Sequence, residues 1–315
     1  MININDNQQQ QERRKLRYSF NYVDSCNMCD SKTDTHKILG KRLNKSQGLR
    51  PKNKTGVTTT IAKCSSCGLI YANPQPVPFD LQDHYGIPPE AYWKESYFTL
   101  DKKYFQGEIE RLRGLLTFKD GMKALDIGAG LGKAMISLEN AGFDTYGFEP
   151  SQQFHERAIS KMGINPQKLK LGMIEEMNYP ENMFDFISFG AVLEHLYAPS
   201  ESVLKALKWL KPNGIMHIEV PSSDWLINKL INFVYRISGT DYVSNLSPMH
   251  EPFHLFEFGL RSFQEHAQKN RYEIAAHDYY VCQTYMPKIA DSLLKPYMKW
   301  TNQGMQLCVW LKKPE

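Results

Sequence analysis

The chain has 315 residues, a formal net charge of +4, 42% hydrophobic residues and 23% charged residues, a composition typical of a globular protein with one large and one smaller domain. This mild charge neither requires nor excludes an acidic partner, and no dense Lys/Arg run indicates a nucleic-acid-binding protein. No apolar run is long enough to span a membrane, and the polar N-terminus lacks the apolar core of a signal peptide, so we expect a cytoplasmic protein without a transmembrane segment.

The N-terminal part carries two Cys-x-x-Cys pairs. Residues 1–16 are rich in Asn and Gln and then charged, which predicts a disordered tail. The cysteines of the two pairs are Cys26, Cys29, Cys64 and Cys67. Four thiolates can surround Zn²⁺ tetrahedrally, and a chain without an export signal is expected to keep its thiols reduced. We therefore predict a structural zinc module over residues 17–80, with a hairpin between the pairs; disulfides or free thiols are the alternative.

A connector follows the predicted zinc module. Residues 69–79 contain three prolines that exclude a helix, and residues 81–98 are rich in aromatic side chains. These aromatic residues have two interpretations: a lid over a ligand pocket, or packing of one domain against the other. Apolar spacing over residues 100–118 predicts a helix, so we assign residues 81–120 to a helical connector or lid.

The most informative stretch is Lys123–Gly132, which reads Lys-Ala-Leu-Asp-Ile-Gly-Ala-Gly-Leu-Gly. Its apolar start, its alternating glycines and the helical pattern that follows predict a strand, a glycine turn and a helix. This geometry brings a ligand against bare backbone at the carboxyl end of a strand. A second predicted strand ends in Glu149, about 20 residues on, where such folds bind ribose hydroxyls. Asp126, just before the turn, would repel a pyrophosphate but suits a cationic ligand.

From residue 122 onward, predicted strands and helices alternate, which indicates a parallel sheet with helices on both faces. The predicted strands are 122–127, 144–149, 168–172, 184–190 and 214–220, and the helices between them are 132–142, 151–162 and 200–211. Another helix is predicted over 261–270, and the strands predicted over 273–282 and 305–312 would close the sheet as an antiparallel hairpin. A strongly apolar helix over 222–238 has three interpretations: a lid for an apolar or lipid-linked substrate, a membrane-surface element, or a helix packed on the core or on a partner subunit.

Four motifs resemble those of class I S-adenosylmethionine-dependent methyltransferases. They are Asp-Ile-Gly-Ala-Gly-Leu-Gly at 126–132, Phe-Glu-Pro-Ser at 148–151, Phe-Asp-Phe-Ile-Ser-Phe-Gly-Ala-Val-Leu-Glu-His-Leu at 184–196 and Leu-Lys-Pro-Asn-Gly-Ile at 210–215. The resemblance covers roughly residues 120 to 311, about 60 per cent of the chain. It implies an α/β fold in which a Rossmann-like, seven-stranded methyltransferase sheet over residues 121–315 carries a small N-terminal zinc-binding module.

The same resemblance implies a binding site for S-adenosylmethionine. Asp126, Gly128 and Gly130 match positions at the methionine end, and Glu149 matches the acid that binds both ribose hydroxyls. Ile174 and Glu175 fall where the adenine is held, although Glu176 is an alternative to Glu175. The remaining matches are Phe189 and Gly190, beneath the methyl group.

Histidines near the predicted strand ends are the candidates for acid–base chemistry. His195 follows Glu194 and could act as a base or have a structural hydrogen-bonding role. The stretch His250-Glu251-Pro-Phe-His254 resembles the segment that supplies a Tyr/His-Glu-His catalytic set in sugar C-methyltransferases with a four-cysteine zinc domain. Here Pro and Phe separate Glu251 from His254, which makes an oxygen acceptor at least as plausible as carbon. His250 and His254 also have helical metal-ligand spacing, against which the intervening proline argues.

The leading hypothesis is a methyltransferase that acts on a sugar or nucleotide-sugar in polysaccharide or natural-product assembly. One alternative is an RNA methyltransferase whose zinc module grips RNA. It is supported by basic residues in that module: Lys32, Lys37, Lys41, Arg42, Lys45, Arg50, Lys52 and Lys54. The other alternative is a non-catalytic scaffold that binds S-adenosylmethionine without turning over an acceptor.

Overall fold

The computed structural model describes residues 18–43, 58–79, 93–244, 254–282 and 287–315. The predicted tail over 1–16, most of the aromatic-rich segment 81–98, and the candidate residues His250 and Glu251 lie outside the described residues.

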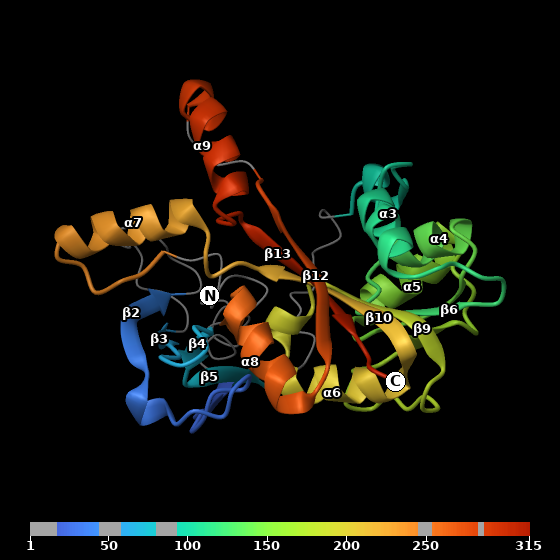
Figure 1. Cartoon of the computed structure of the whole chain (residues 1–315), viewed down its shortest axis with the longest axis horizontal. Coiled ribbons are helices and arrows are strands. Elements are labelled where there is room, and N and C mark those ends of the chain that lie inside the picture. The colour runs from blue at the N-terminus through green and yellow to red at the C-terminus, as the bar shows by residue number, and fades with distance from the viewer. Residues whose placement is uncertain (1–17, 44–57, 80–92, 245–253, 283–286) are drawn as a thin grey trace, which may run out of the picture.

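The centre of the fold is a seven-stranded sheet with the strand order β12-β13-β10-β9-β6-β7-β8 (Figure 1). Its strands are β6 (Lys123–Ile127), β7 (Asp144–Glu149), β8 (Leu169–Leu171), β9 (Phe184–Gly190), β10 (Leu210–Pro221), β12 (Glu273–Tyr280) and β13 (Gln306–Lys312). β13 is antiparallel to both its neighbours, and all other pairs are parallel. The predicted Rossmann-like sheet, closed by an antiparallel hairpin, is therefore confirmed.

Helices cover both faces of this sheet because each has one apolar stripe. α3 (Gln106–Leu115) and α4 (Lys133–Asn140) bury Leu112 and Leu138 with Phe186 and Trp310 of the sheet. On the other face, α6 (Pro199–Trp209) and α8 (Leu260–Asn270) pack in the largest core cluster, where Val203 and Phe263 are fully buried. α5 (Gln152–Met162) follows β7 and packs through Ala158.

The N-terminal module is built on a four-stranded antiparallel sheet, β11-β4-β3-β2. β2 (Lys37–Leu43) and β3 (Thr58–Lys63) form the hairpin that was predicted between the cysteine pairs, and β4 (Ile70–Asn73) follows the second pair. β1 (Tyr18–Asn21) pairs with β5 (Gln75–Pro78) as a separate two-stranded ribbon. Proline is tolerated in such an edge strand because its missing N–H is not needed by a second neighbour.

The fourth strand of the module comes from the far end of the chain. β11 (Phe256–Glu257) lies between β10 and α8 in sequence, yet pairs with β4 of the module. The amide of Ala72 donates to the carbonyl of Leu255 (3.1 Å), and Tyr197 OH donates to the carbonyl of Pro76 (2.8 Å). Three buried cysteines share one core cluster with Phe256. The module therefore packs directly on the large sheet; the predicted division at residues 80 and 120 stays a prediction.

Two helices extend from the body in Figure 1. α7 (Leu226–Ile237) lies within the predicted helix 222–238. α9 (Lys288–Trp300) connects β12 to β13 and was not predicted. Pro296 inside α9 interrupts the pattern that would have indicated a helix. Among the helices of the described ranges, none has the length and apolar character needed to cross a membrane.

Candidate active site and cysteine cluster

The glycine turn at the carboxyl end of β6 has the conformation that its sequence predicts. Gly128, Gly130 and Gly132 have φ angles of +68°, +54° and +74°, a region that favours glycine. A Cβ on Gly128 would lie 2.5 Å from Cγ2 of Val192, whereas a Cβ on Gly130 would meet no atom of the described residues within 4 Å. Gly128 thus allows the loop after β9 to approach the turn, and Gly130 borders open space in which a ligand can lie.

Glu149, at the end of β7, is fixed against this turn. Its Oε2 accepts a hydrogen bond from the amide of Gly130 and its Oε1 accepts one from the amide of Ser151, both at 2.8 Å. Glu149 is buried, and burial raises the pKa of its carboxyl, opposed by these two hydrogen bonds. The carboxylate is therefore preorganised beside the open space at Gly130.

Asp126, the last polar residue of β6, lies close enough to Glu149 to interact with its charge. Burial, and secondarily the charge of Glu149, raises the pKa of Asp126 to about 7. The phenol of Tyr104 lies near the same carboxyl. Its burial, and to a smaller extent the charges of Asp126 and Glu219, raise the pKa of the Tyr104 phenol to about 12. Buried carboxyls of this kind favour a cationic ligand, because a positive charge would offset both their burial and their mutual repulsion.

The other predicted cofactor residues lie at the ends of β8 and β9. Ile174 is buried in the turn after β8. At the start of this turn, the amide of Gly172 donates a hydrogen bond to the carbonyl of Glu149 (3.1 Å). Glu175 is exposed, and its backbone carbonyl accepts a hydrogen bond from Lys205. Phe189 is fully buried and Gly190 is exposed at the end of β9. Only Gly190 of this last pair therefore presents backbone to solvent at the strand end.

A cluster of Glu194, His195 and His254 lies just beyond β9. One carboxylate oxygen of Glu194 and one ring nitrogen of each histidine lie within 4.8 Å of one another. The centroids of the two imidazole rings are 4.4 Å apart. The backbone fixes this arrangement, because the amide of Leu255 donates to the carbonyl of Glu194 (2.7 Å). The two predicted histidines are thus brought together across nearly sixty residues of chain.

Glu194 is the functional candidate that sequence reasoning misses. Its side chain is 1% exposed, burial raises its pKa to about 8, and its Oε2 has no hydrogen-bond partner among the described residues. The only sequence signal was its position next to His195. The arrangement places a buried carboxyl beside two imidazoles, which suits proton transfer. With the carboxyl ionised, the same three groups match the donor set of a divalent cation.

The four predicted metal ligands also come together. The Sγ atoms of Cys26 and Cys67 are 3.5 Å apart, as are those of Cys29 and Cys64, and all four lie within 4.8 Å of one another. These separations exceed the roughly 2.05 Å of a disulfide bond, and none of the four is bonded to another. A hydrogen bond from Cys67 lowers the pKa of Cys26 to about 5 and raises that of Cys67. The geometry and the thiol–thiolate character fit a tetrahedral, sulfur-ligated metal.

A chain of hydrogen bonds supports the cysteine cluster. The Ser31 hydroxyl contacts Sγ of Cys64 (3.0 Å) and Nε2 of His36 (2.9 Å). The other ring nitrogen of His36 contacts the hydroxyl of Tyr71, which lies on β4 (2.5 Å). Such outer contacts orient metal ligands, and here they connect the cluster to the strand that pairs with β11.

Comparison with known proteins identifies the family. Residues 99–277, more than half of the chain, match the family described as a methyltransferase domain. The chain belongs to this family.

Relatives of this methyltransferase-family chain include enzymes of known name. It is 28% identical over 145 residues to a ubiquinone biosynthesis O-methyltransferase of Bradyrhizobium diazoefficiens, covering 45% of this chain and 54% of the relative. A protein of the same name from Rhodopseudomonas palustris is 26% identical over the same shares. An uncharacterized methyltransferase of Schizosaccharomyces pombe is 30% identical over 108 residues, 29% of this chain and 37% of the relative. The chain thus spans about half the length, or less, of the curated relatives it matches.

Two solved structures are also similar. An S-adenosylmethionine-dependent methyltransferase from Mesorhizobium loti has a TM-score of 0.47 and 11% identity, covering 65% of this chain and 97% of that one. The [4+2]-cyclase SpnF has a TM-score of 0.46 and 16% identity, covering 69% of this chain and 83% of that one.

A second polar group of the methyltransferase-family chain was not predicted. His217, Glu219 and Cys308 lie on the sheet face that α3 covers, with ligand-capable atoms within 4.8 Å of one another. Burial lowers the pKa of His217 to about 3 and raises that of Glu219 to about 7. The imidazole of His217 contacts Ser188 (3.3 Å) and lies against Trp310. Because the imidazole of His217 is neutral and packed between the rings of Phe105 and Trp310, we assign this polar group a structural role in the core.

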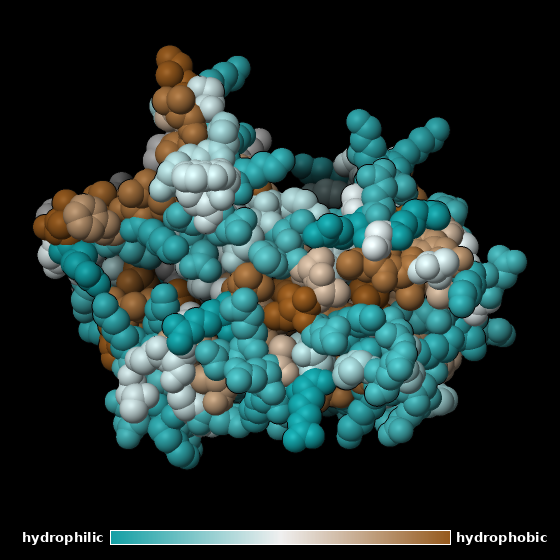
Figure 2. All heavy atoms as spheres, viewed as in Figure 1, coloured by the Kyte–Doolittle hydropathy of each residue, from teal (hydrophilic) through white to brown (hydrophobic). Residues whose placement is uncertain are grey.

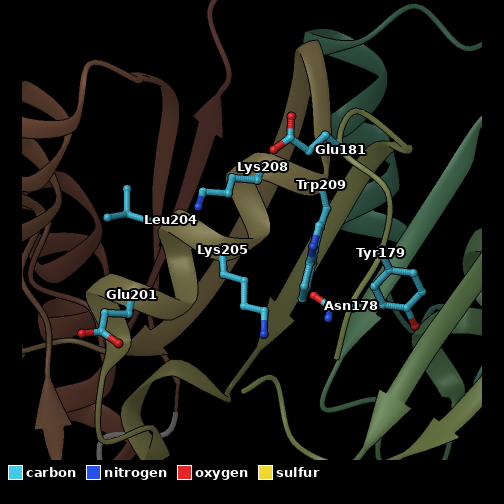
Figure 3. A pocket seen from close by; sticks show the side chains of 8 residues that line it. All are labelled: Asn178, Tyr179, Glu181, Glu201, Leu204, Lys205, Lys208 and Trp209. Atoms are coloured by element: carbon cyan, nitrogen blue, oxygen red, sulfur yellow. The ribbon is translucent and has the colours of Figure 1, made fainter. Parts of the chain in front are cut away.

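A surface groove of about 460 Å³ lies apart from these clusters (Figure 3). It is lined by Asn178, Tyr179, Glu181, Glu201, Leu204, Lys205, Lys208 and Trp209. None of the predicted site residues that the structure describes lines this groove. Its position along α6 places it outside the candidate active site.

Of the basic residues that motivated an RNA-binding module, Arg42 and Lys41 have other contacts, whereas Lys32 and Lys37 are exposed. Arg42 is 2% exposed and donates from Nη1 to the carbonyl of Val243 (3.2 Å). Lys41 forms a salt bridge with Asp241 at 2.9 Å. Lys45, Arg50, Lys52 and Lys54 lie outside the described residues.

Proposed function

We propose that this chain is an S-adenosylmethionine-dependent methyltransferase that transfers the methyl group to a hydroxyl of a small molecule, a sugar or nucleotide-sugar. One observation carries the proposal. The buried carboxyls of Asp126 and Glu149 end β6 and β7, and the Glu194–His195–His254 cluster follows β9, so all lie at one carboxyl edge of the sheet. Ligands of open α/β sheets bind at this edge, between strands that depart in different directions.

The residues at the glycine turn fit the methyl donor, which supplies an activated methyl group on a sulfonium when it is bound. The carboxylate of Glu149 would accept hydrogen bonds from both ribose hydroxyls. Asp126 would pair with the ammonium of the methionine end, which offsets the burial of its carboxyl. Gly130 leaves the space that the ligand needs, because it carries no side chain.

The histidine cluster supplies the base that an oxygen acceptor needs. As the acceptor oxygen bonds to the methyl carbon, its proton passes to an imidazole nitrogen of His195 or His254, and the sulfur keeps the electron pair of the broken C–S bond. Glu194, with its pKa raised to about 8, is largely protonated near neutral pH and adds no negative charge beside the acceptor. The rest of the rate enhancement comes from holding the hydroxyl in line with the methyl group.

We further propose that Cys26, Cys29, Cys64 and Cys67 bind a structural Zn²⁺ whose role is to position His254. The route runs through backbone: Tyr71 on β4 pairs with Phe256 on β11, two residues after His254. The side chain of Tyr71 contacts His36, which is linked through Ser31 to Cys64. A metal that orders the module thereby orders one member of the histidine cluster.

An oxygen acceptor on a small molecule is favoured by two observations. Two of the three relatives reported above are O-methyltransferases of ubiquinone biosynthesis, and the segment around His254 departs from the sugar C-methyltransferase pattern. The RNA alternative receives less support, because Arg42 is buried and Lys41 is paired with Asp241.

The direct test measures demethylated product after incubation of the purified protein with S-adenosylmethionine and a panel of nucleotide-sugars and sugars. We expect turnover with at least one acceptor and a loss of roughly 10²–10⁴-fold in kcat for His195→Ala or His254→Ala, whichever is the base, with unchanged donor affinity. Calorimetry with the donor and with Glu149→Ala is the companion measurement. Absence of donor binding, or a Glu149→Ala variant that binds like the parent, would contradict the proposal. Donor binding without turnover of any acceptor would favour the scaffold.

A further inference from the structure

The two helices that extend from the body lie at the same edge of the sheet as the proposed site. β10 leads into α7, and β12 leads into α9, which returns to β13. Gln306 of β13 pairs with Pro221 of β10 on one side and with Tyr280 of β12 on the other. Both helices therefore start from the carboxyl edge, on the side of the sheet where Glu149 and the histidine cluster lie.

The inner faces of α7 and α9 hold them to the protein. Ile227 of α7 and Met298 of α9 are almost fully buried in one apolar cluster with Trp225. α7 is also fixed by Asn232, which donates to the carbonyl of Ser244 (2.8 Å) and accepts from its amide (2.6 Å). These contacts use only one side of each helix.

The outer faces are apolar and exposed. On α7 the exposed apolar residues are Leu230, Phe233, Val234 and Ile237, and on α9 they are Ile289, Leu293, Tyr297 and Trp300. Their exposed fractions run from 43% to 83%, and their spacing of three or four residues places each set on one face of its helix. Figure 2 shows apolar surface over both helices. Two exposed apolar stripes on fixed helices indicate a surface that binds something apolar.

The charges beside these stripes indicate what binds. Arg236 on α7 and Lys288 and Lys299 on α9 are exposed, and α7 contains no acidic residue. The acidic residue of α9, Asp291, is paired with Lys295 (3.2 Å). A helix with a basic polar side, and with Trp, Tyr, Phe and aliphatic residues on the other, suits the boundary between lipid headgroups and acyl chains.

We propose that the outer faces of α7 and α9 bind the surface of an anionic phospholipid bilayer. A second copy of the chain fits the charges less well, because a two-fold contact between these faces would gather the basic residues of both copies in one interface. Docking through these helices would turn the carboxyl edge of the sheet toward the membrane. The inference does not depend on methyl transfer.

The experiment is co-sedimentation of the full chain with vesicles of phosphatidylcholine alone and of phosphatidylcholine with phosphatidylglycerol. We expect salt-sensitive binding to the anionic vesicles, weakened at least tenfold by the double substitution Phe233→Ser and Trp300→Ser. The matched control is Ile38→Ser with Phe79→Ser, which removes apolar residues of similar exposure (62% and 69%) from the N-terminal module. This control should bind like the parent.

A charge pair completes the test. Lys288→Glu with Lys299→Glu should weaken binding to the anionic vesicles by roughly fivefold or more per position, whereas Lys119→Glu with Lys208→Glu should have little effect. Circular dichroism checks that each variant is folded. Absence of vesicle binding, or binding that the α7 and α9 substitutions leave unchanged, overturns the proposal. Light scattering that shows a dimer dissociated by Phe233→Ser and Trp300→Ser, without vesicle binding, assigns the surface to a second copy.

Discussion

The substitution Gly130→Ala tests whether the open space at the glycine turn is the donor site. Gly130 has a φ of +54°, and an added Cβ would meet no atom of the described chain within 4 Å. Within the protein alone, the methyl group therefore introduces only the strain of a left-handed alanine, about 1 kcal/mol. That strain corresponds to a fall in Tm of roughly 2–4 °C. If the donor occupies this space, the same methyl group also collides with it.

Gly121→Ala is the matched control. Gly121 has a φ of +77° and precedes β6 at the opposite end of the strand, and a Cβ added to it would likewise meet no described atom within 4 Å. Its substitution introduces the same backbone strain at the amino edge of the sheet, far from the proposed site. Any difference in ligand affinity between the two variants therefore reports on the ligand and not on stability.

We expect calorimetric titration with S-adenosylhomocysteine to show a loss of roughly 10- to 100-fold in affinity for Gly130→Ala, since one misplaced methyl group in a packed site costs about 1–3 kcal/mol. Gly121→Ala should bind like the parent. Thermal unfolding should show similar small losses in both variants. Parental Kd values in both variants, or equal losses of affinity in both, would show that the donor does not occupy the space at Gly130.

Three further predictions concern charge and metal. The Kd for the donor should fall roughly tenfold from pH 6 to pH 8, because the carboxyl of Asp126, with a pKa of about 7, must ionise to pair with an ammonium. In Asp126→Asn the Kd should be nearly independent of pH. A parental Kd that rises with pH would contradict this role. The folded-state pKa of Glu194, about 8, lies above the ordinary glutamate value of 4.5, so the stability that depends on its protonation is fully present below pH 4.5 and is lost as the pH rises toward 8. Urea unfolding should therefore show that the free energy of unfolding falls between pH 5.5 and pH 7.5, and that this fall is greater by roughly 2 kcal/mol in the parent than in Glu194→Gln. Equal falls in the two proteins would mean that a group other than Glu194 titrates. Cys64→Ser should abolish stoichiometric binding of zinc, measured by elemental analysis. It should lower Tm and kcat with little change in donor affinity, because the module positions His254 and not the glycine turn. A metal-free variant with the parental kcat would contradict the proposed link between the metal site and His254.

The sequence alone determined the parts of this protein that depend on local backbone geometry. The glycines after β6 require positive φ angles, so they marked the turn without knowledge of the fold. Alternation of strand and helix patterns implied a parallel sheet, and the two Cys-x-x-Cys pairs implied a thiol cluster that the fold brings together. Glu149 was found because its distance from the turn is set by one strand–helix–strand unit.

Tertiary structure decided the contacts between segments that are distant in sequence. Nothing in the sequence around His254 predicts that it lies beside Glu194 and His195; the hydrogen bond from the amide of Leu255 to the carbonyl of Glu194, together with the pairing of β11 with β4, places it there. The raised pKa of Glu194 likewise comes from burial, which depends on what covers the residue. Helix α7 was predicted, but whether its apolar face is covered depends on the arrangement of all other elements, and the structure leaves that face exposed. Backbone preferences act over a few residues, whereas burial, charge and proximity belong to the folded chain as a whole.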